Sequence, residues 1–350
     1  MTPAPLFLQT DALTLGLETS CDETSAAVLR GGREIVALVT ATQDHLHRVF
    51  GGVVPEVASR RHVEVITRLV EDCLQAASVG FADLNLLAVT QGPGLVGSLL
   101  VGVSAVKGYA LATGLPLAAV NHLEGHLMAA FLHRPGEEPA ARDLYPTLGL
   151  IASGGHSDLV LMQGPGEYQT VGQTKDDAGG EALDKAARLL GLGFPGGPAL
   201  EQAALGGNPA AIAFPRPEAG HYDYSFSGLK TALVRHVQRH GEPPDEQARA
   251  DLAASYQQAV VDTLVRGLRR AAKNYHVRQL VLGGGVSANQ VLRRAFLALA
   301  RDLGVPGACP PLSLCTDNAA MIAAAGFLQA TRRGPDALDF DVYSVLALEG

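Results

Sequence analysis

The sequence has little cysteine. Its four cysteines, Cys21, Cys73, Cys309 and Cys315, form no C-x-x-C pair and are spread along 350 residues. Such spacing fits free thiols in a reducing compartment and not a disulfide framework. We therefore expect a cytoplasmic protein.

Long apolar runs without polar interruption are also missing. The most apolar segment, Leu95 to Thr113, contains Lys107 and the glycines Gly97, Gly102 and Gly108. A membrane-spanning helix needs about 20 predominantly apolar residues with few charges. The segment therefore predicts a buried helix, and we expect no association with a membrane.

Charged residues are scarce, at 18% of the chain, and acidic ones outnumber basic ones to give a net charge of −8. This balance disfavours indiscriminate binding to nucleic acid but does not exclude a local basic patch. Hydrophobic residues make up 47%, enough for two domains with real cores, and the 40 glycines indicate tight turns and not disorder.

Two pairs of segments repeat in the same order. LGLETSCDETSAAVL (15–29) and LGLIASGGHSDLVLM (148–162) each place a polar turn between two apolar strands, as in a β-hairpin. Segments 87–120 and 280–310 each contain an apolar strand, a glycine-rich loop, a helix and a short apolar strand. The order indicates an internal duplication with a period too long for a solenoid, although such patterns are common in α/β proteins.

The duplication predicts two α/β lobes that face each other across a cleft. We assign residues 12–133 to an N-terminal lobe, 134–146 to a linker rich in proline and charge, and 147–317 to a C-terminal lobe. We expect the C-terminal helix, residues 318–345, to join the N-terminal lobe.

The stretch NHLEGH (121–126) is a candidate metal site. His122 and His126 share one face of a helix, as metal ligands do, and hydrogen-bonded surface histidines have the same spacing. The zinc-protease signature H-E-x-x-H has its glutamate directly after the first histidine, whereas Glu124 stands one residue later and points away. In the second repeat Asp317 takes the place of the histidines. Two imidazoles and a carboxylate suit Fe(II) or Zn(II) with open positions, although Asp317 could instead cap a helix.

Three further stretches could bind a ligand. In ASGGHSD (152–158) backbone amides could approach a ligand closely, with Ser153 and His156 as side-chain partners, or the stretch is a plain hairpin turn. In 176–197 the apolar helical face is formed by Ala182, Leu183, Ala186, Leu189 and Leu190. The other faces offer Asp184 to a ribose or amino group, or a solvated Glu181–Lys185 pair. In LGGGVSANQVLRR (282–294) three glycines precede a helix whose first turns hold Asn289, without the lysine of a Walker loop.

Taken together, these stretches resemble the tRNA N6-adenosine threonylcarbamoyltransferase family, whose members were once described as glycoproteases. The matching motifs cover residues 12 to 330 in order and include ETSCDETSAAV, VNHLEGH, ASGGHSDL, YSFSGLKTA and CTDNAAMIA. The resemblance implies a duplicated actin/Hsp70/sugar-kinase-like (ribonuclease-H-like) α/β fold with two lobes around a nucleotide cleft. Departures from the family pattern are Gln173, Gly179 and Leu183, and none removes a proposed ligand.

The resemblance also implies site residues. His122, His126 and Asp317 would hold one divalent metal, most often Fe(II), with Zn(II) as the alternative. The adenylated substrate would be contacted by a larger set: Ala152, Ser153, Gly154, Gly155, His156, Asp184, Gly197, Glu201 and Asn289. The general base is unassigned, with Glu124 and Asp22 as weak candidates.

The implied reaction moves threonylcarbamoyl from threonylcarbamoyl-AMP to N6 of adenosine 37 in tRNAs that read codons starting with A. The implied partners are tRNA, a shorter paralogue of the same fold (TsaB-like) and a small P-loop ATPase (TsaE-like). Alternatives are an ATP-dependent kinase of the same fold, a metalloprotease, disfavoured by the shifted Glu124, and a silent scaffold. Candidate phosphate contacts are Arg60, Arg61, Arg266, Arg269, Arg270, Lys273, Arg293, Arg294, Arg332 and Arg333.

Overall fold

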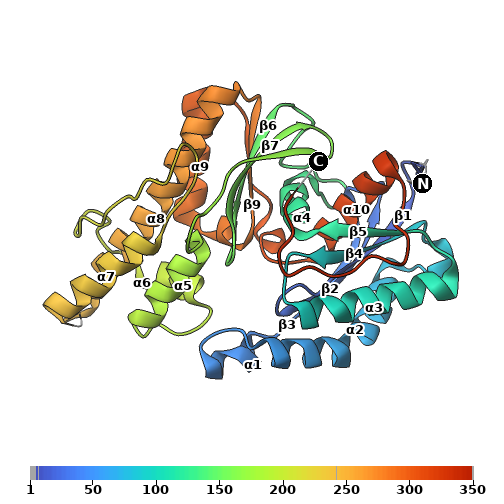
Figure 1. The fold of residues 1–350 in the computed structure, drawn as a ribbon, viewed down its shortest axis with the longest axis horizontal. Helices are drawn as coiled ribbons and strands as arrows, with labels where there is room; N and C mark the ends of the chain where they lie inside the picture. Colours follow the sequence, from blue (N-terminus) through green and yellow to red (C-terminus); the bar gives the residue numbers. More distant parts are fainter. Residues whose placement is uncertain (1–4, 7, 242, 349–350) are drawn as a thin grey trace.

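A computed structural model describes residues 5, 6, 8–241 and 243–348 of the protein. Two five-stranded sheets form its framework (Figure 1). The first has the order β3-β2-β1-β4-β5. Its strands are β1 (Leu13–Glu18), β2 (Glu23–Arg30), β3 (Glu34–Thr42), β4 (Leu86–Gly92) and β5 (Leu117–Asn121).

The second sheet repeats this topology, with the order β10-β9-β6-β7-β8. Its strands are β6 (Thr147–Ala152), β7 (Ser157–Gly164), β8 (Glu167–Gly172), β9 (Gln279–Gly283) and β10 (Gly307–Ala308). In each sheet three consecutive strands pair antiparallel, and the last two join in parallel through a helical crossover. The predicted duplication and α/β class are confirmed.

Helices α2 (Pro55–Ala77) and α3 (Val96–Thr113) cover the outer face of the first sheet, with α3 against β4. The segment predicted as a buried helix is helical, but only one of its faces is buried. Leu111 is 73% exposed and Leu100 is 46% exposed, because α3 meets the sheet and α2 on one side and solvent on the other. By length and composition α3 could cross a membrane, but here it forms part of a folded layer.

The helices of the second half gather outside its sheet, at the left of Figure 1. They are α5 (Gly179–Leu189), α6 (Gly196–Ala203), α7 (Ser227–His240), α8 (Glu246–Tyr275) and α9 (Gln290–Leu303). On α5 the predicted core positions Ala182, Leu183 and Ala186 are buried. Leu189 was wrongly placed on that face: it is 41% exposed, because the helix ends there and Ala187 is buried instead.

Two helices lie between the sheets: α4 (His122–Met128) and α10 (Ala319–Arg333). Helix α10 packs on β1, β2, β4 and β5, and α4 packs on α10, β6 and β9. The approach is close because small side chains line α10, which begins AAMIAAAG. A Cβ at Gly16 of β1 would lie 2.4 Å from the carbonyl oxygen of Ala319 and 2.8 Å from the Cβ of Ala323.

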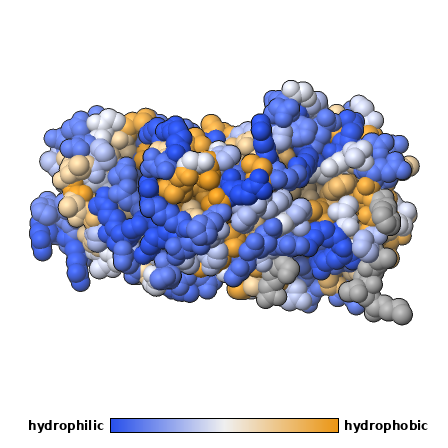
Figure 2. Space-filling view, turned by 90° about the horizontal axis from the view of Figure 1, so that it is seen from above, coloured by the Kyte–Doolittle hydropathy of each residue, from blue (hydrophilic) through white to orange (hydrophobic). Residues whose placement is uncertain are grey.

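The remaining helical elements are short. They are α1 (Asp44–His47) and the 3-10 turns η1 (Arg48–Phe50), η2 (Phe81–Asp83), η3 (Ala129–Phe131), η4 (Gly285–Ala288) and η5 (Leu312–Leu314). The face drawn in Figure 2 is mainly hydrophilic, with apolar side chains in smaller patches. Most charged side chains that the structure describes are exposed or half-buried, as burial costs predict, whereas Glu18, Asp22, Glu124 and Asp158 are buried.

We expect Gly16→Ala to lower the free energy of unfolding by about 1–3 kcal/mol, because the new methyl group forces α10 away from the first sheet. The matched control is Gly108→Ala on α3, where an added Cβ meets no atom within 4 Å. That change should raise stability by about 0.5–1 kcal/mol, as alanine does inside a helix. Urea unfolding measures both, and an unchanged midpoint for Gly16→Ala would contradict the packing constraint.

Candidate metal centre and substrate cleft

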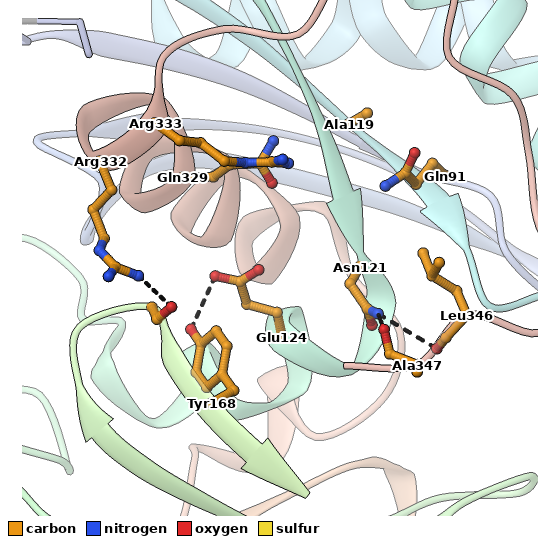
Figure 3. Close-up of a pocket in the computed structure, with 11 residues that line it drawn as sticks. Gln91, Ala119, Asn121, Glu124, Tyr168, Gln329, Arg332, Arg333, Leu346 and Ala347 are labelled. Atoms are coloured by element: carbon orange, nitrogen blue, oxygen red, sulfur yellow. Dashed lines mark hydrogen bonds between the residues drawn. The ribbon is translucent and has the colours of Figure 1, made fainter. Parts of the chain in front are cut away.

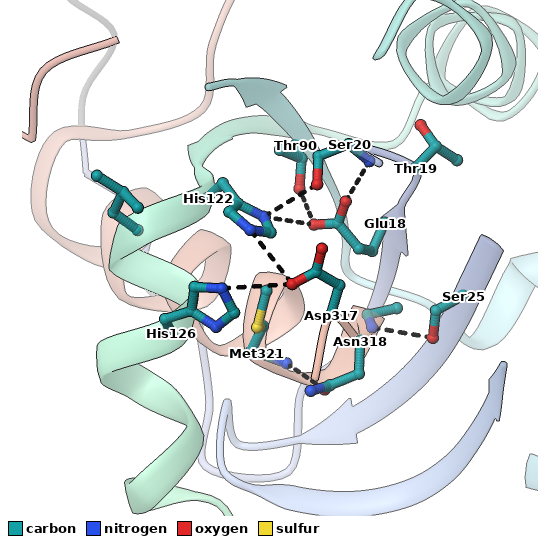
Figure 4. Close-up of polar contacts among 12 residues, drawn as sticks. Glu18, Thr19, Ser20, Ser25, Thr90, His122, His126, Asp317, Asn318 and Met321 are labelled. Atoms are coloured by element: carbon teal, nitrogen blue, oxygen red, sulfur yellow. Dashed lines mark hydrogen bonds and ion pairs between the residues drawn. The ribbon is translucent and has the colours of Figure 1, made fainter. Parts of the chain in front are cut away.

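Helix α4 presents its two histidines toward the start of α10 (Figure 4). The helix begins at His122 because the side chain of Asn121 accepts a hydrogen bond from the amide of Leu123 at 2.9 Å. The Nε2 atoms of His122 and His126 lie 3.4 and 3.3 Å from Oδ1 of Asp317. The three candidate ligand atoms all lie within 4.8 Å of one another. The structure thus brings together the three predicted metal ligands.

Asp317 is not the cap of the helix that follows it. The N-cap of α10 is Asn318, whose side chain accepts a hydrogen bond from the amide of Met321 at 3.1 Å. The alternative that Asp317 serves as a cap is therefore wrong by one residue. Its carboxylate is left to face the histidines.

A buried carboxylate orients His122 through the ring nitrogen that faces away from Asp317. Glu18, at the end of β1, is fully buried, and its Oε2 lies 3.1 Å from Nδ1 of His122. The same oxygen accepts a hydrogen bond from Thr90 at 2.6 Å, and the hydroxyl of Ser20 lies 3.3 Å from Nδ1 of His122. This arrangement fixes the ring of His122 with Nδ1 toward Glu18 and Nε2 toward Asp317. Glu18 was not among the predicted site residues, although it opens the polar turn of the first repeat.

The polar atoms of the cluster are poorly satisfied without a cation. Both ring nitrogens of His126 are buried and form no well-directed hydrogen bond with any residue that the structure describes. Burial opposes ionisation of Asp317, but the adjacent His122 and His126 outweigh it and lower the pKa of Asp317. Burial lowers the pKa of His126, and the neighbouring His122 lowers it further. Two imidazoles and an ionised carboxylate with open surroundings fit a divalent metal.

Glu124 points from α4 toward Tyr168 (Figure 3). It is two residues from each histidine, about 200° around the helix, and so lies on the opposite face of α4. Its Oε1 accepts a hydrogen bond from the hydroxyl of Tyr168 at 2.9 Å, and burial raises the pKa of Glu124 to about 7. The carboxyl group lines a separate cavity of about 480 Å³, whose other walls include Arg332 and Arg333. Its position therefore does not support a role as general base at the metal centre.

Asp22, the other candidate base, lies in the turn between β1 and β2. It is 8% exposed, two residues beyond Ser20. Burial and then the charges of Asp317 and Asp22 raise the pKa of the next residue, Glu23, so these three carboxyl groups lie within electrostatic reach of one another. Asp22 is thus on the metal side of the fold.

The hairpin between β6 and β7 brings the glycine turn to the same region. The amide of Ser153 donates to the carbonyl of His156 at 2.9 Å, which closes the turn. Gly154 and Gly155 are exposed, and an added Cβ at either would meet no atom within 4 Å, so their backbone is open to a ligand. Burial, followed by the charges of His122 and His126, lowers the pKa of His156 to about 4. His156 is therefore neutral at physiological pH and lies within electrostatic reach of His122 and His126.

Ala152, the last residue of β6, contacts the glycine loop after β9. Gly284 has φ +85°, and an added Cβ there would lie 2.4 Å from the carbonyl oxygen of Ala152. Only glycine fits this position, which holds the two turns together. The three glycines lead into η4 and not directly into a helix, because α9 begins later, at Gln290.

The remaining predicted contacts make bonds within the protein. Oδ1 of Asp184 accepts from the amide of Gly197 at 2.8 Å, and Oε1 of Glu201 accepts from the amide of Gln290 at 2.7 Å. Asn289 is the N-cap of α9, and its amide group donates to Gln257 at 2.8 Å. Asn289 thus precedes the helix whose first turns it was expected to occupy, because η4 intervenes. Asp184 and Gly197 are thus hydrogen-bonded to each other, whereas Glu201 and Asn289 both bond to residues at the start of α9.

The fold is the duplicated actin/Hsp70/sugar-kinase-like one that the motifs predicted. HypF from T. kodakarensis superposes with a TM-score of 0.62 at 13% identity, over 94% of this chain and 49% of that protein. A ROK family glucokinase from Streptomyces griseus superposes with a TM-score of 0.51 at 14% identity, over 91% and 99%. At such identities these likenesses establish the fold alone.

Sequence comparison identifies the family. The profile of tRNA N6-adenosine threonylcarbamoyltransferase matches residues 34–324. A protein of that name from Desulfitobacterium hafniense (strain Y51) is 52% identical over 319 residues, 91% of this chain and 92% of that one. Another from Anaeromyxobacter dehalogenans (strain 2CP-C) is 53% identical over 328 residues, 92% and 96%. The chain belongs to the tRNA N6-adenosine threonylcarbamoyltransferase family and is a transferase, as the motifs predicted.

We expect Glu124→Gln to leave the bound metal unchanged and His126→Ala to lose most of it. Glutamine keeps an acceptor for Tyr168 and faces the other cavity, whereas alanine removes one of three ligands. Elemental analysis of each purified protein gives metal per chain, and circular dichroism confirms the fold. Loss of metal in Glu124→Gln, or peptidase activity that follows the wild type and disappears in this variant, would revive the protease interpretation.

Proposed function

We propose that this chain transfers the threonylcarbamoyl group from threonylcarbamoyl-AMP to N6 of adenosine 37 in tRNAs that read codons starting with A. Membership of the family supports the reaction class. The observation that carries the proposal is the closeness of the histidine–aspartate cluster to the glycine turn between β6 and β7. The cluster of His122, His126 and Asp317 lies within electrostatic reach of His156, in a turn whose glycine backbone is open.

The proposed cofactor is one divalent metal, Fe(II) in preference to Zn(II), held by His122, His126 and Asp317. When bound, such an ion binds carboxylate oxygen and polarises a carbonyl. Glu18 supports it indirectly, because its hydrogen bond to His122 fixes the tautomer that leaves Nε2 free. Neutral His156 would then add a hydrogen bond to the substrate.

The proposed substrate side comprises Ala152, Ser153, Gly154, Gly155, His156, Asp184, Gly197, Glu201 and Asn289. A mixed carbamic–phosphoric anhydride is already activated, so the protein has to position it and stabilise charge and does not need a nucleophile. The exposed amides of Gly154 and Gly155 suit the phosphate, and Asp184 offers an acceptor to a hydroxyl or amino group. Of the two candidate bases, Asp22 lies on the side of Asp317, whereas Glu124 lines a separate cavity.

We also propose the lobe boundaries 12–133 and 147–317 with a linker at 134–146. Helix α10 packs on the first sheet, which favours the assignment of 318–345 to the N-terminal lobe. The helix itself is shorter than predicted, because it ends at Arg333 with Gly334 as its C-cap. The proposed partners are tRNA, a shorter paralogue of the same fold (TsaB-like) and a small P-loop ATPase (TsaE-like). The proposed compartment is the cytoplasm.

The direct test supplies the wild-type chain and its partner proteins with threonylcarbamoyl-AMP and unmodified tRNA. We expect threonylcarbamoyladenosine among the nucleosides detected by mass spectrometry after digestion, and none with His126→Ala. Absence of the modified nucleoside with a metal-loaded, folded wild type would refute the proposed function. Phosphorylation of a small molecule at the expense of ATP would point to a kinase.

Within the same cleft we expect Asp184→Ala to weaken binding of a non-hydrolysable adenylate analogue about tenfold or more, as the loss of a hydrogen bond to a charged group does. Bound metal should be unchanged, because Asp184 accepts a hydrogen bond from Gly197 and is not one of the three clustered ligands. Glu181→Ala on the same helix is the control, since Glu181 pairs with Lys185 at 2.6 Å on an exposed face. Isothermal titration measures the affinities, and equal affinity in both variants would remove Asp184 from the substrate site.

A further inference from the structure

The cavity that Glu124 lines lies on the side of α4 opposite the metal cluster. Its volume is about 480 Å³, within the usual range of small-molecule sites in proteins. In Figure 3 the side chains of Arg332 and Arg333 lie above those of Glu124 and Tyr168. No step of the proposed reaction takes place in this cavity.

The walls of the cavity are tied together by hydrogen bonds. The side-chain amide of Asn121 donates to the carbonyl of Ala347 at 3.0 Å, which ties the C-terminal segment to β5. The side chain of Asp336 accepts from the amide of Ala119 at 2.8 Å and from the side chain of Gln329 at 2.6 Å. These bonds join β5, α10 and the C-terminal segment into a preformed pocket, so a ligand does not have to order the chain in order to bind.

Glu124 offers an unused acceptor to this cavity. The residue is 8% exposed, and its side-chain hydrogen bond within the described part of the chain comes from Tyr168 alone. A carboxylate has about four acceptor sites, and a buried polar group without partners costs free energy. Because Glu124 lines the cavity, the complement that this wall lacks is a ligand group that donates hydrogen bonds.

Two cations line the same cavity. Arg332 donates to the carbonyl of Gly166 and pairs with Glu167 at 3.2 Å. Arg333 makes no side-chain hydrogen bond with any residue that the structure describes, and its ion pair with Asp336 spans 3.6 Å. The guanidinium of Arg333 is therefore the freer of the two, and its planar set of donors suits a carboxylate.

The opposite charges of the cavity act on each other without pairing. Arg332 and Arg333 oppose the rise in the pKa of Glu124 that burial causes, so they lie within electrostatic reach of it. Each arginine forms its ion pair elsewhere and not with Glu124. A simple anion would leave Glu124 without a donor, and a simple cation would be repelled by two arginines. The complement of this lining is one molecule that carries both a cationic donor and an anion.

We propose that this cavity binds a free α-amino acid, with its ammonium group on Glu124 and its carboxylate on Arg333. An α-amino acid carries both charges on one carbon, and its side chain would occupy the remaining space beside Gln91 and Leu346, which also line the cavity. The bound amino acid would contact α4 from the face opposite the metal cluster. Binding here needs neither tRNA nor the adenylate, so it is independent of the proposed function.

Isothermal titration of the full-length chain tests the ligand class. Each common amino acid is added in turn to the wild-type protein, and the one that binds most tightly is compared with two of its derivatives. The N-acetyl derivative lacks the ammonium group, and the amide derivative lacks the carboxylate. We expect each derivative to bind about tenfold or more weakly, as the loss of a hydrogen bond to a charged group predicts. No saturable binding of any amino acid, or undiminished affinity for either derivative, would overturn the proposal.

Matched variants locate the binding. We expect Arg333→Ala and Glu124→Gln each to lower the affinity about tenfold or more. Arg301→Ala, which removes an exposed arginine of α9 outside the cavity, should leave it unchanged. His126→Ala should also keep wild-type affinity, because it alters the other face of α4.

Circular dichroism confirms the fold of each variant. The side chain of Arg333 is 59% exposed, so Arg333→Ala keeps the test decisive even if Glu124→Gln does not fold. Wild-type affinity in Arg333→Ala would overturn the proposal. Loss of binding in His126→Ala would overturn it as well, because the amino acid would then occupy the metal centre.

Discussion

The close packing of α4 against α10 is the constraint on which the site depends. A Cβ at Gly125 of α4 would lie 2.8 Å from Cδ1 of Ile322 on α10, and one at Gly283 of β9 would lie 2.4 Å from the carbonyl oxygen of His126. Helix α4 is therefore wedged between α10 and the second sheet with no spare room. This wedge brings histidines from one repeat to within 3.4 Å of an aspartate from the other. Neither repeat alone could form the centre.

Helix α4 separates two groups of ionisable side chains. On one face, the buried carboxylates Glu18 and Asp317 raise the pKa of His122 despite the opposing effect of burial. On the other, Glu124 sits with Tyr168 and has a raised pKa. Buried charges rarely stabilise a fold by themselves, because desolvation offsets their attraction. The cluster on the histidine face is therefore better explained by ligand binding than by stability.

Much of this could be predicted from the sequence because duplication and ligand spacing are local patterns. The two hairpins, the two strand–helix–strand units and the place of Asp317 opposite the histidines follow from comparing one repeat with the other. The role of Glu18 could not be predicted, because its bond to His122 joins residues 104 apart across a sheet edge. The exposed Leu189 and the capping Asn318 were missed because helix ends depend on hydrogen bonds that periodicity does not encode.

Charge placement explains how an acidic chain can serve an RNA substrate. Most of the arginines that the sequence offered as phosphate contacts are paired with carboxylates in the structure: Arg60, Arg61, Arg266, Arg269, Arg332 and Arg333. Pairing at the surface stabilises little, but it leaves few cations free to attract a polyanion at long range. Bulk electrostatic attraction is therefore a weak basis for binding the proposed tRNA substrate, and short-range contacts have to contribute more.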